Sequence, residues 1–207
     1  MEKLNFRQLV HKENMMKKIN VVALIGKAGA GKDYYLRRVC ECADVHEIIS
    51  CTTRPVRDGE LEGVNYHYLS DEQFLRGSYI ESCMFRGWRY GTRISDLDPD
   101  KINVGVFNLS GVEQLLMNKD IDLTVIQITA TDKVRLIRQL NREFDPDVNE
   151  IMRRFKTDEE DFNQDRLTYI QQALPDKFYW ISNNSNDYDG TIFNVNRIIE
   201  IIKANRI

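Results

Sequence analysis

A short apolar segment followed by a glycine-rich loop places the strongest limit on the fold of this chain. The segment 19–26, INVVALIG, is rich in β-branched residues, as in a strand buried on both faces of a parallel sheet. The loop then reads Gly26-x4-Gly31-Lys32, and residues 33–43 have the pattern of a helix. In this context, backbone N–H groups and a helix N-terminus bind phosphate. The segment therefore predicts an α/β fold that carries a nucleotide site.

The residue that follows the loop lysine is unusual. A Ser or Thr commonly stands there, whereas this chain has Asp33. We favour a role for its carboxylate at or near Mg²⁺, directly or through water, because carboxylate oxygens are suitable Mg²⁺ ligands. Capping of the following helix is the alternative. Lys32 supplies a positive charge for the outer phosphates of a nucleoside triphosphate. The residues predicted to bind ATP here are Gly26, Ala28, Gly29, Ala30, Gly31, Lys32, Asp33 and Tyr34.

Length and charge narrow the classes of function. The 207 residues suit one compact α/β unit, and the net charge of -3 argues against a nucleic-acid partner. The longest apolar run, 21–25, is far too short to span a bilayer, and the start of the chain has no signal-peptide pattern. The cysteines lack the paired spacing of a zinc site, so we interpret them as reduced thiols. These features predict a cytoplasmic protein without a membrane partner.

Changes in composition divide the chain into parts. Residues 1–16 are polar and weakly patterned, and we interpret them as an N-terminal extension. Residues 17–50 and 97–207 alternate strand and helix patterns and form the core. Between them, residues 51–96 contain more glycine and charge, with short alternating segments typical of small antiparallel strands. This part is predicted to be an inserted subdomain, in which Ser70 and Gln73 form the capping box of a helix.

The remaining core elements follow from periodicity. Short apolar runs predict strands, and longer periodic segments predict helices. The expected strands are 46–50, 103–108, 123–128 and 177–182, and the expected helices are 111–118, 131–143, 149–174 and 190–205. The alternation predicts a central parallel sheet flanked by helices.

The segment 49–70, ISCTTRPVRDGELEGVNYHYLS, closely resembles the guanylate kinase family. That family has Ser-x-Thr-Thr-Arg, a second Arg, Gly-Glu, and then Gly-x-x-Tyr-x-Phe or a close variant. YIES and RYGT follow in the family's order and roughly at its spacing, and IMRRF comes later. The similarity runs over about residues 19–205. It implies the fold of a P-loop nucleoside monophosphate (NMP) kinase, with an NMP-binding subdomain at 51–96 and a mobile helical lid at 138–156.

The resemblance implies a binding site for the phosphate of the acceptor nucleotide. The matching positions are Arg54 and Arg57, which offer guanidinium forks, and Tyr66 and Tyr90, which offer neutral O–H donors. Without the family's order of motifs, the two arginines would be ordinary solvated loop charges.

A second group matches the positions that surround the base. Glu81 occupies the family's place for a carboxylate that accepts hydrogen bonds from guanine N1–H and the 2-amino group. An exposed glutamate at a strand end is the alternative. Ser50 and Thr92 match the neighbouring hydroxyl-bearing residues around the base or the phosphate.

The segment 105–111, GVFNLSG, departs from the family's Leu-Asp-x-Asp-x-Gln-Gly. Val106 and Asn108 replace the two aspartates. We hypothesise that Asp33 compensates for the loss of the first, by bringing an acidic group to the metal from the other side. Asn108 can donate as well as accept hydrogen bonds, so selection for guanine is expected to loosen. The expected acceptor is GMP, dGMP or a broader set of monophosphates.

The lid also departs from the family pattern. Arg138 and Arg142 are each about one residue off the family's register, but positions four apart share a helix face, so both are expected to reach the phosphates. The alternative is surface charge on a charged helix. Arg154 matches a family lid arginine, and Asn183 matches the family's Asn near the adenine.

These expectations combine into one reaction, in which ATP and a nucleoside monophosphate give ADP and the diphosphate. The implied catalytic residues are Lys32, Arg54, Arg138, Arg142 and Arg154. ATP is the co-substrate, Mg²⁺ is the cofactor, and the protein is expected to be a monomer or homodimer. The alternatives are a broad-specificity deoxynucleoside monophosphate kinase and a binding module without turnover. Such modules typically lose the loop lysine or glycines, all of which remain here.

Overall fold

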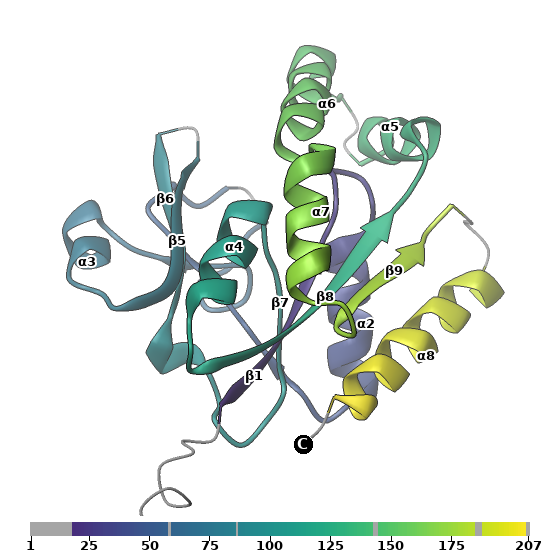
Figure 1. The fold of residues 1–207 in the computed structure, drawn as a ribbon. Helices are drawn as coiled ribbons and strands as arrows, with labels where there is room; N and C mark the ends of the chain where they lie inside the picture. Colours follow the sequence, from purple (N-terminus) through teal and green to yellow (C-terminus); the bar gives the residue numbers. More distant parts are fainter. Residues whose placement is uncertain (1–17, 58, 86, 143–144, 185–187, 206–207) are drawn as a thin grey trace, which may run out of the picture.

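The computed structural model describes residues 18–57, 59–85, 87–142, 145–184 and 188–205. They form a parallel sheet with helices on both faces and a smaller second sheet beside it (Figure 1). The expected N-terminal extension, 1–16, lies outside the described residues. The predicted fold class is confirmed.

The core sheet has the strand order β2-β7-β1-β8-β9, and all of its pairs are parallel. Its strands are β1 (Ile19–Ile25), β2 (His46–Glu47), β7 (Asn103–Val106), β8 (Ile121–Thr129) and β9 (Phe178–Ser182). Val21 in β1 lies opposite Asn103 on one side and Leu123 on the other. β1 is therefore the central strand, and its carboxyl end delivers the glycine-rich loop to one edge of the sheet.

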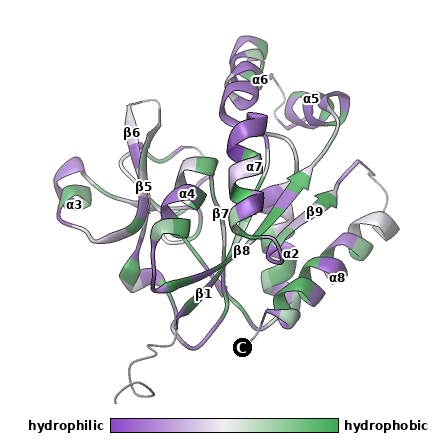
Figure 2. Cartoon of the chain, viewed as in Figure 1, coloured by the Kyte–Doolittle hydropathy of each residue, from purple (hydrophilic) through white to green (hydrophobic). Residues whose placement is uncertain are grey.

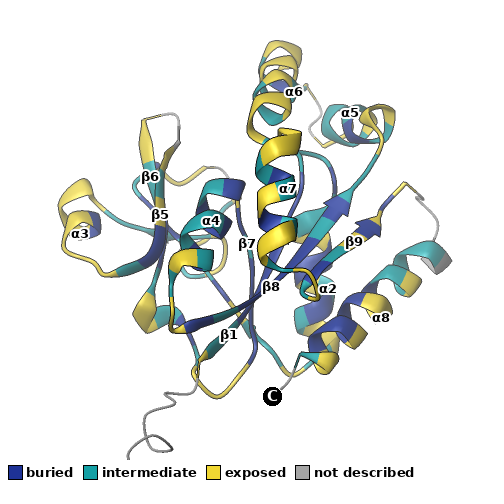
Figure 3. Ribbon diagram, viewed as in Figure 1, coloured by how far each residue is buried: buried dark blue, intermediate teal, exposed yellow. Residues whose placement is uncertain are grey.

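Two hydrophobic cores cover the two faces of this sheet. Val21 and Ala23 pack with α4 (Leu109–Met117) and α7 (Gln164–Ala173). Val22 and Leu24 pack with α2 (Lys32–Cys42) and α8 (Tyr188–Ala204). Figure 2 shows the hydrophobic residues along the strands, and Figure 3 shows these strands as the buried layer. Because successive residues of a strand face opposite sides, a continuous apolar run supplies both cores.

The second sheet lies in the segment expected to be an inserted subdomain and has the order β4-β3-β6-β5. Its strands are β3 (Cys51–Thr52), β4 (His67–Tyr68), β5 (Tyr79–Phe85) and β6 (Trp88–Arg93). β5 and β6 are antiparallel, as the alternating pattern predicts, but the expectation is wrong for β4, which pairs with β3 in parallel. The capping box at the start of α3 (Asp71–Leu75) is also present, with Ser70 Oγ accepting from Gln73 N at 3.1 Å and Gln73 Oε1 accepting from Ser70 N at 2.8 Å. A short 3₁₀ helix, Ile94–Asp96, leads back to the core.

Several predicted boundaries are wrong. The long helix 149–174 is two helices, α6 (Val148–Asp161) and α7, because Asn163 Oδ1 accepts from Arg166 N at 3.0 Å and starts a new helix. The expected strand 46–50 pairs only at its first two residues. The helix expected at 131–143 is α5 (Asp132–Leu140), which ends earlier. α4 starts at Leu109 rather than at 111.

The helices α5 and α6 lie beyond the carboxyl end of β8 (Figure 1). Each has little buried surface, since Arg135 is the buried residue of α5 and Ile151 that of α6. Their arrangement leaves this part of the molecule attached to the core through few contacts. In the part of the chain that the structure describes, no helix combines the length and apolar character that a bilayer crossing requires.

Candidate active site

The phosphate loop joins β1 to α2 and depends on its glycines. Gly26 has φ 152° and Gly31 has φ 101°, which favours glycine. A Cβ at Gly26 would lie 2.3 Å from Ile128 O, and one at Gly31 would lie 2.5 Å from Asn183 Nδ2. The loop therefore passes very close to β8 and to the end of β9. This close approach requires glycine at both positions.

Lys32 folds back over this loop from the first position of α2. Its Nζ donates to Gly26 O at 2.7 Å and to Lys27 O at 3.4 Å. Burial lowers the pKa of Lys32, while the charges of Asp33 and Asp158 act in the opposite direction. An ammonium group held in this way at a helix N-terminus favours an anion such as phosphate.

Asp33 lies exposed in the first turn of α2, next to Lys32. The alternative that it caps this helix is wrong, because the cap is Gly31 and no side chain bonds the helix start. Burial is the main effect that raises the pKa of Tyr66 to about 12, and the negative charge of Asp33 adds to it. Among the residues described, no three His, Cys, Asp or Glu side chains gather as a metal site. One carboxylate still fits Mg²⁺, which takes its other ligands from phosphates and water. Tyr34 is exposed beside it, with its ring edge-on to Tyr35.

A second cationic cluster surrounds Arg54 in the inserted subdomain. Arg54 is 6% exposed, and its Nη2 donates to Glu60 Oε1 at 2.9 Å. Its guanidinium lies 5.4 Å from the centre of the Tyr66 ring, which is 5.9 Å from the Tyr90 ring. Burial alone would lower the pKa of Arg54, but the bond and charge of Glu60 outweigh it and raise the pKa. Three of the predicted phosphate-binding residues are thus brought together.

Glu60 joins the residues of this cluster by hydrogen bonds, and the sequence analysis did not identify this role. Its Oε2 accepts from Arg57 N at 2.9 Å and from Tyr68 Oη at 2.8 Å, in addition to the bond from Arg54. The hydrogen bond from Arg54 is the largest of the effects that lower the pKa of Glu60 to about 2. The Arg57 side chain is exposed, so only its backbone joins the network. The Gly-Glu pair at 59–60 was the sequence signal for this role, because a buried arginine such as Arg54 requires a carboxylate partner.

Glu81, which was predicted to read the base, lies buried. Its Oε1 accepts from Thr92 Oγ1 at 2.9 Å, and Thr92 Oγ1 is 3.5 Å from Ser50 Oγ. Burial raises the pKa of Glu81, against the effect of the bond from Thr92. The alternative of an exposed glutamate at a strand end is therefore wrong. Its other oxygen faces α4, since a Cβ built on Gly111 would lie 3.0 Å from Glu81 Oε2.

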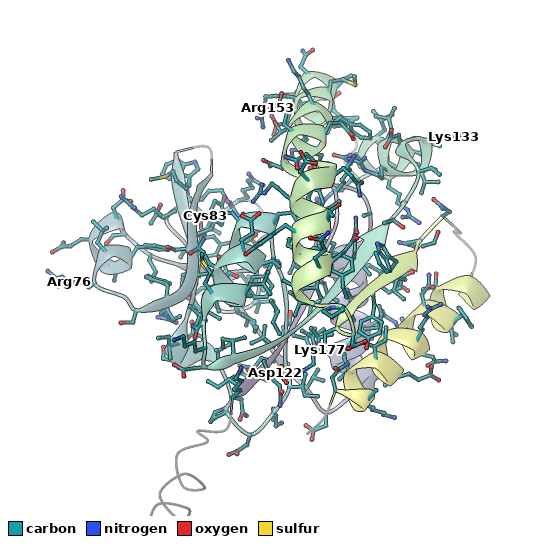
Figure 4. All side chains as sticks on the ribbon, viewed as in Figure 1. Arg76, Cys83, Asp122, Lys133, Arg153 and Lys177 are labelled. Carbon is teal, nitrogen blue, oxygen red and sulfur yellow. The ribbon has the colours of Figure 1, made fainter. Side chains whose placement is uncertain are left out.

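Asn108 lies near Glu81, and it caps a helix, a role that the sequence analysis did not predict. Its Oδ1 accepts from Gly111 N at 2.7 Å and so caps α4. Its Nδ2 donates to Cys83 Sγ at 3.2 Å, and Figure 4 labels Cys83 on β5 beside α4. The amide is therefore fixed by α4 and β5, with its oxygen bonded to the helix.

Asn183 and Arg138 lie on the outer side of the phosphate loop. Asn183 Nδ2 donates to Ala30 O at 2.8 Å, and its Oδ1 accepts from Tyr35 Oη at 2.9 Å. Arg138 Nη1 lies 3.5 Å from Gly29 O, and its Nη2 lies 3.4 Å from Asn183 Oδ1. The buried Asn183 therefore ties the end of β9 to the loop.

The other lid arginines lie apart from Arg138. The expectation that Arg138 and Arg142 share a helix face is wrong, because α5 ends at Leu140. Arg142 instead lines a cavity of about 50 Å³ together with Arg154 and Glu150. Arg154 Nε donates to Glu150 Oε1 at 2.8 Å, while the nearby Arg153, labelled in Figure 4, is exposed. The predicted lid cations thus form two separate groups.

Comparisons with known proteins identify relatives of this chain. The family model described as guanylate kinase matches residues 16–201. A guanylate kinase from Salinibacter ruber is 30% identical over 166 residues, which cover 75% of this chain and 81% of that relative. Similarity to a guanylate kinase from Frankia casuarinae reaches 40% identity over 79 residues, which is 36% of this chain and 43% of the relative. The alignment to one from Chlorobium luteolum likewise spans only 39% of that protein's length.

A solved structure shares the fold. The crystal structure of guanylate kinase from Anaplasma phagocytophilum superposes with a TM-score of 0.57 at 20% identity, and the match covers 94% of this chain and 90% of that one.

Proposed function

The chain belongs to the guanylate kinase family, and on that premise we propose that it transfers the γ-phosphoryl group of ATP to GMP or dGMP. The observation that carries this proposal is that one molecule holds two separate clusters of groups that could bind anions. One is the glycine-rich loop with Lys32, and the other is the Arg54 cluster with Glu81 behind it. The charge of Asp33 acts on groups of both sites, namely Lys32 and Tyr66, which supports their being neighbours.

The ATP phosphates would bind at the loop. The start of α2, Lys32 and the loop backbone would supply the donors, although Ala28 N–H donates to Asp158 Oδ2 in this structure. Asp33 is the proposed Mg²⁺ ligand. When it is bound with ATP, the Mg²⁺ ion would neutralise charge on the β- and γ-phosphates. Lys32 must leave Gly26 O in order to reach a phosphate, which its flexible stem permits.

The acceptor phosphate would bind at the Arg54 cluster. Glu60 holds the Arg54 guanidinium beside the rings of Tyr66 and Tyr68, 5.4 Å and 5.8 Å from their centres, so contacts within the protein orient the cation. The phenol O–H groups of Tyr66 and Tyr90 would donate hydrogen bonds to the phosphate without adding charge. Arg57 would approach from its exposed loop position.

The base would bind against Glu81. A carboxylate accepts hydrogen bonds from N1–H and the 2-amino group of guanine, whereas adenine cannot supply both donors. Thr92 fixes one oxygen of Glu81 and leaves the other directed toward α4. This arrangement supports guanine as the preferred base.

Catalysis in this proposal consists of positioning and charge neutralisation. The acceptor phosphate attacks in line, so neither a covalent nucleophile nor a strong base is required. Arg138 already lies at the loop, whereas Arg142 and Arg154 lie together on the segment 138–156, which we propose as the lid. Closure of this lid would carry their charges to the transferred group and exclude water.

A broad-specificity deoxynucleoside monophosphate kinase is the second candidate. It is favoured by Asn108, since an amide stands where the family has an acceptor-only carboxylate. A binding module without turnover is disfavoured, because Lys32 and the loop glycines are retained. We further propose a cytoplasmic monomer or homodimer without nucleic-acid or membrane partners, in keeping with the net charge of -3.

A coupled assay of ADP release tests these candidates with GMP, dGMP, dTMP, AMP and CMP as acceptors. Turnover that is highest with GMP or dGMP, and at least about a hundredfold lower in Lys32→Ala, supports the proposal. The matched control is Lys133→Ala, which removes an exposed lysine of α5. Activity spread across all acceptors supports the second candidate, and no turnover with any acceptor supports the binding module.

A further inference from the structure

Arg135 is a buried cation of α5 that touches the phosphate loop. Its side chain is 2% exposed, and its Nε donates to Ala28 O at 3.0 Å. Its Nη1 donates to Asp132 Oδ1 at 2.8 Å and its Nη2 to Asp158 Oδ2 at 2.7 Å. The guanidinium also lies 4.3 Å from the centre of the Phe155 ring. Each nitrogen of the guanidinium therefore donates a hydrogen bond, and the bond from Nε holds the phosphate loop.

Asp158 completes the contact from α6. The same oxygen that accepts from Arg135 also accepts from Ala28 N at 2.7 Å. Ala28 is thus held at both its carbonyl and its N–H, by side chains from two different helices. An ion pair between Lys27 and Glu159 adds a second link between the loop and α6.

The packing beside the loop explains why such contacts matter. A cavity of about 200 Å³ lies there, lined in part by Lys27, Ala30, Thr129 and Arg135. Ala30 itself is packed in the core, whereas next to this space Ala28 is held by its hydrogen bonds with Arg135 and Asp158.

Arg135 and Asp158, which we call the clamp, also lie on either side of the proposed lid in the sequence. Arg135 precedes the segment 138–156 and Asp158 follows it. Their ion pair closes the base of the lid, and Ala28 is attached at that closure.

We propose that Arg135 and Asp158 are positioning residues that hold the phosphate loop in the form that binds ATP. The pair places opposite charges close together, so it holds the loop with little net charge facing the phosphates. Loss of either partner leaves the other charge partly buried and Ala28 held at one group only. This inference rests on the proposed ATP-dependent function, but it concerns only the ATP side of the reaction.

The test compares Asp158→Ala and Asp158→Asn with Glu160→Ala, which removes an exposed carboxylate from the same helix. ATP affinity is measured by calorimetry without an acceptor, and KM for ATP and for GMP by the coupled assay. Hydrogen exchange of peptides covering residues 26–32 reports loop order directly, and thermal unfolding reports the fold.

We expect Asp158→Ala to weaken ATP binding by about tenfold or more, since a hydrogen bond to a charged group is lost. KM for GMP at saturating ATP should stay the same, and exchange in the loop should increase. Asp158→Asn should have a smaller effect, because its amide oxygen can still accept from Ala28 N–H. Glu160→Ala should match the wild type.

Unchanged or tighter ATP binding in Asp158→Ala would overturn the proposal, and tighter binding would mean that Asp158 competes with phosphate. An equal loss of ATP and GMP affinity together with a lower melting temperature would also overturn it. If the wild type binds ATP but does not phosphorylate GMP, the proposed function fails. The calorimetric comparison still tests the clamp in that case.

Discussion

Glu60 receives a hydrogen bond from Arg54 at 2.9 Å and is the residue that holds this arginine beside the rings of Tyr66 and Tyr68. The guanidinium is almost completely buried, so its orientation depends on a carboxylate that is only six positions away in the sequence. Contacts within the protein thus fix the orientation of Arg54, which we propose as part of the acceptor site.

The first prediction concerns this carboxylate. Glu60→Gln should lower the free energy of unfolding at neutral pH by about 1–3 kcal/mol, because a charge-assisted bond to a buried arginine is lost. KM for GMP should rise, while KM for ATP should remain similar. Because the pKa of Glu60 falls from 4.5 to about 2 on folding, its contribution is present above about 4.5 and lost as the pH falls toward 2. Chemical denaturation of both proteins between pH 7 and pH 2 should therefore show the difference shrinking, and a constant difference would contradict this assignment.

The second prediction concerns Glu81. Glu81→Gln should reduce kcat/KM for GMP by about tenfold to a hundredfold, because the amide cannot accept two donors from guanine. The same change should raise the melting temperature, since burial raises the pKa of Glu81 and the ionised form is costly in the folded state.

The pH dependence separates this role from a structural one. In the wild type, KM for GMP should increase as the pH falls toward the raised pKa of Glu81. The protonated carboxyl group would place an O–H donor opposite the N1–H and 2-amino donors of guanine. Glu81→Gln should lack this dependence. An identical pH profile in both proteins would remove Glu81 from base recognition.

The third prediction concerns Asn108. Asn108→Asp keeps a side-chain oxygen for Gly111 N and should leave the stability of α4 unchanged or slightly higher. It should also raise the preference for GMP over AMP by about tenfold, since an acceptor-only group is restored. Asn108→Ala should cost about 1 kcal/mol of stability through loss of the helix cap. If the GMP-to-AMP ratio of kcat/KM is the same in wild type and Asn108→Asp, the proposed loosening of selectivity does not exist.

The fourth prediction concerns Asp33. Asp33→Ser restores the hydroxyl that usually follows the loop lysine, and the helix cap at Gly31 is unaffected. The Mg²⁺ concentration that gives half-maximal turnover should change, and kcat should fall if the acidic group compensates for the one missing at Val106. Titration of Mg²⁺ at fixed ATP measures this directly. Unchanged turnover and unchanged metal dependence would show that Asp33 has no role at the metal.

Features whose determinants lie close together in the chain could be predicted from the sequence. The strand, loop and helix at 19–43 form a contiguous unit, and the capping box at Ser70 and Gln73 spans three residues. The apolar run of β1 predicts burial on both faces whatever the neighbouring strands are. The order of motifs then led to the residues around Arg54 and Glu81, which the fold brings into two compact groups.

Tertiary structure decided the contacts between residues that are distant in sequence. Arg135 and Asp158 are 23 positions apart, and Asp158 is 130 positions from Ala28, so no local pattern joins them. Asn108 looked like a base-reading residue, yet its oxygen caps α4, because the helix begins two residues earlier than its periodicity indicates. Local propensity and spacing depend on neighbours along the chain, whereas a buried charge or amide is satisfied by whichever partners the packed helices and loops bring within hydrogen-bond distance.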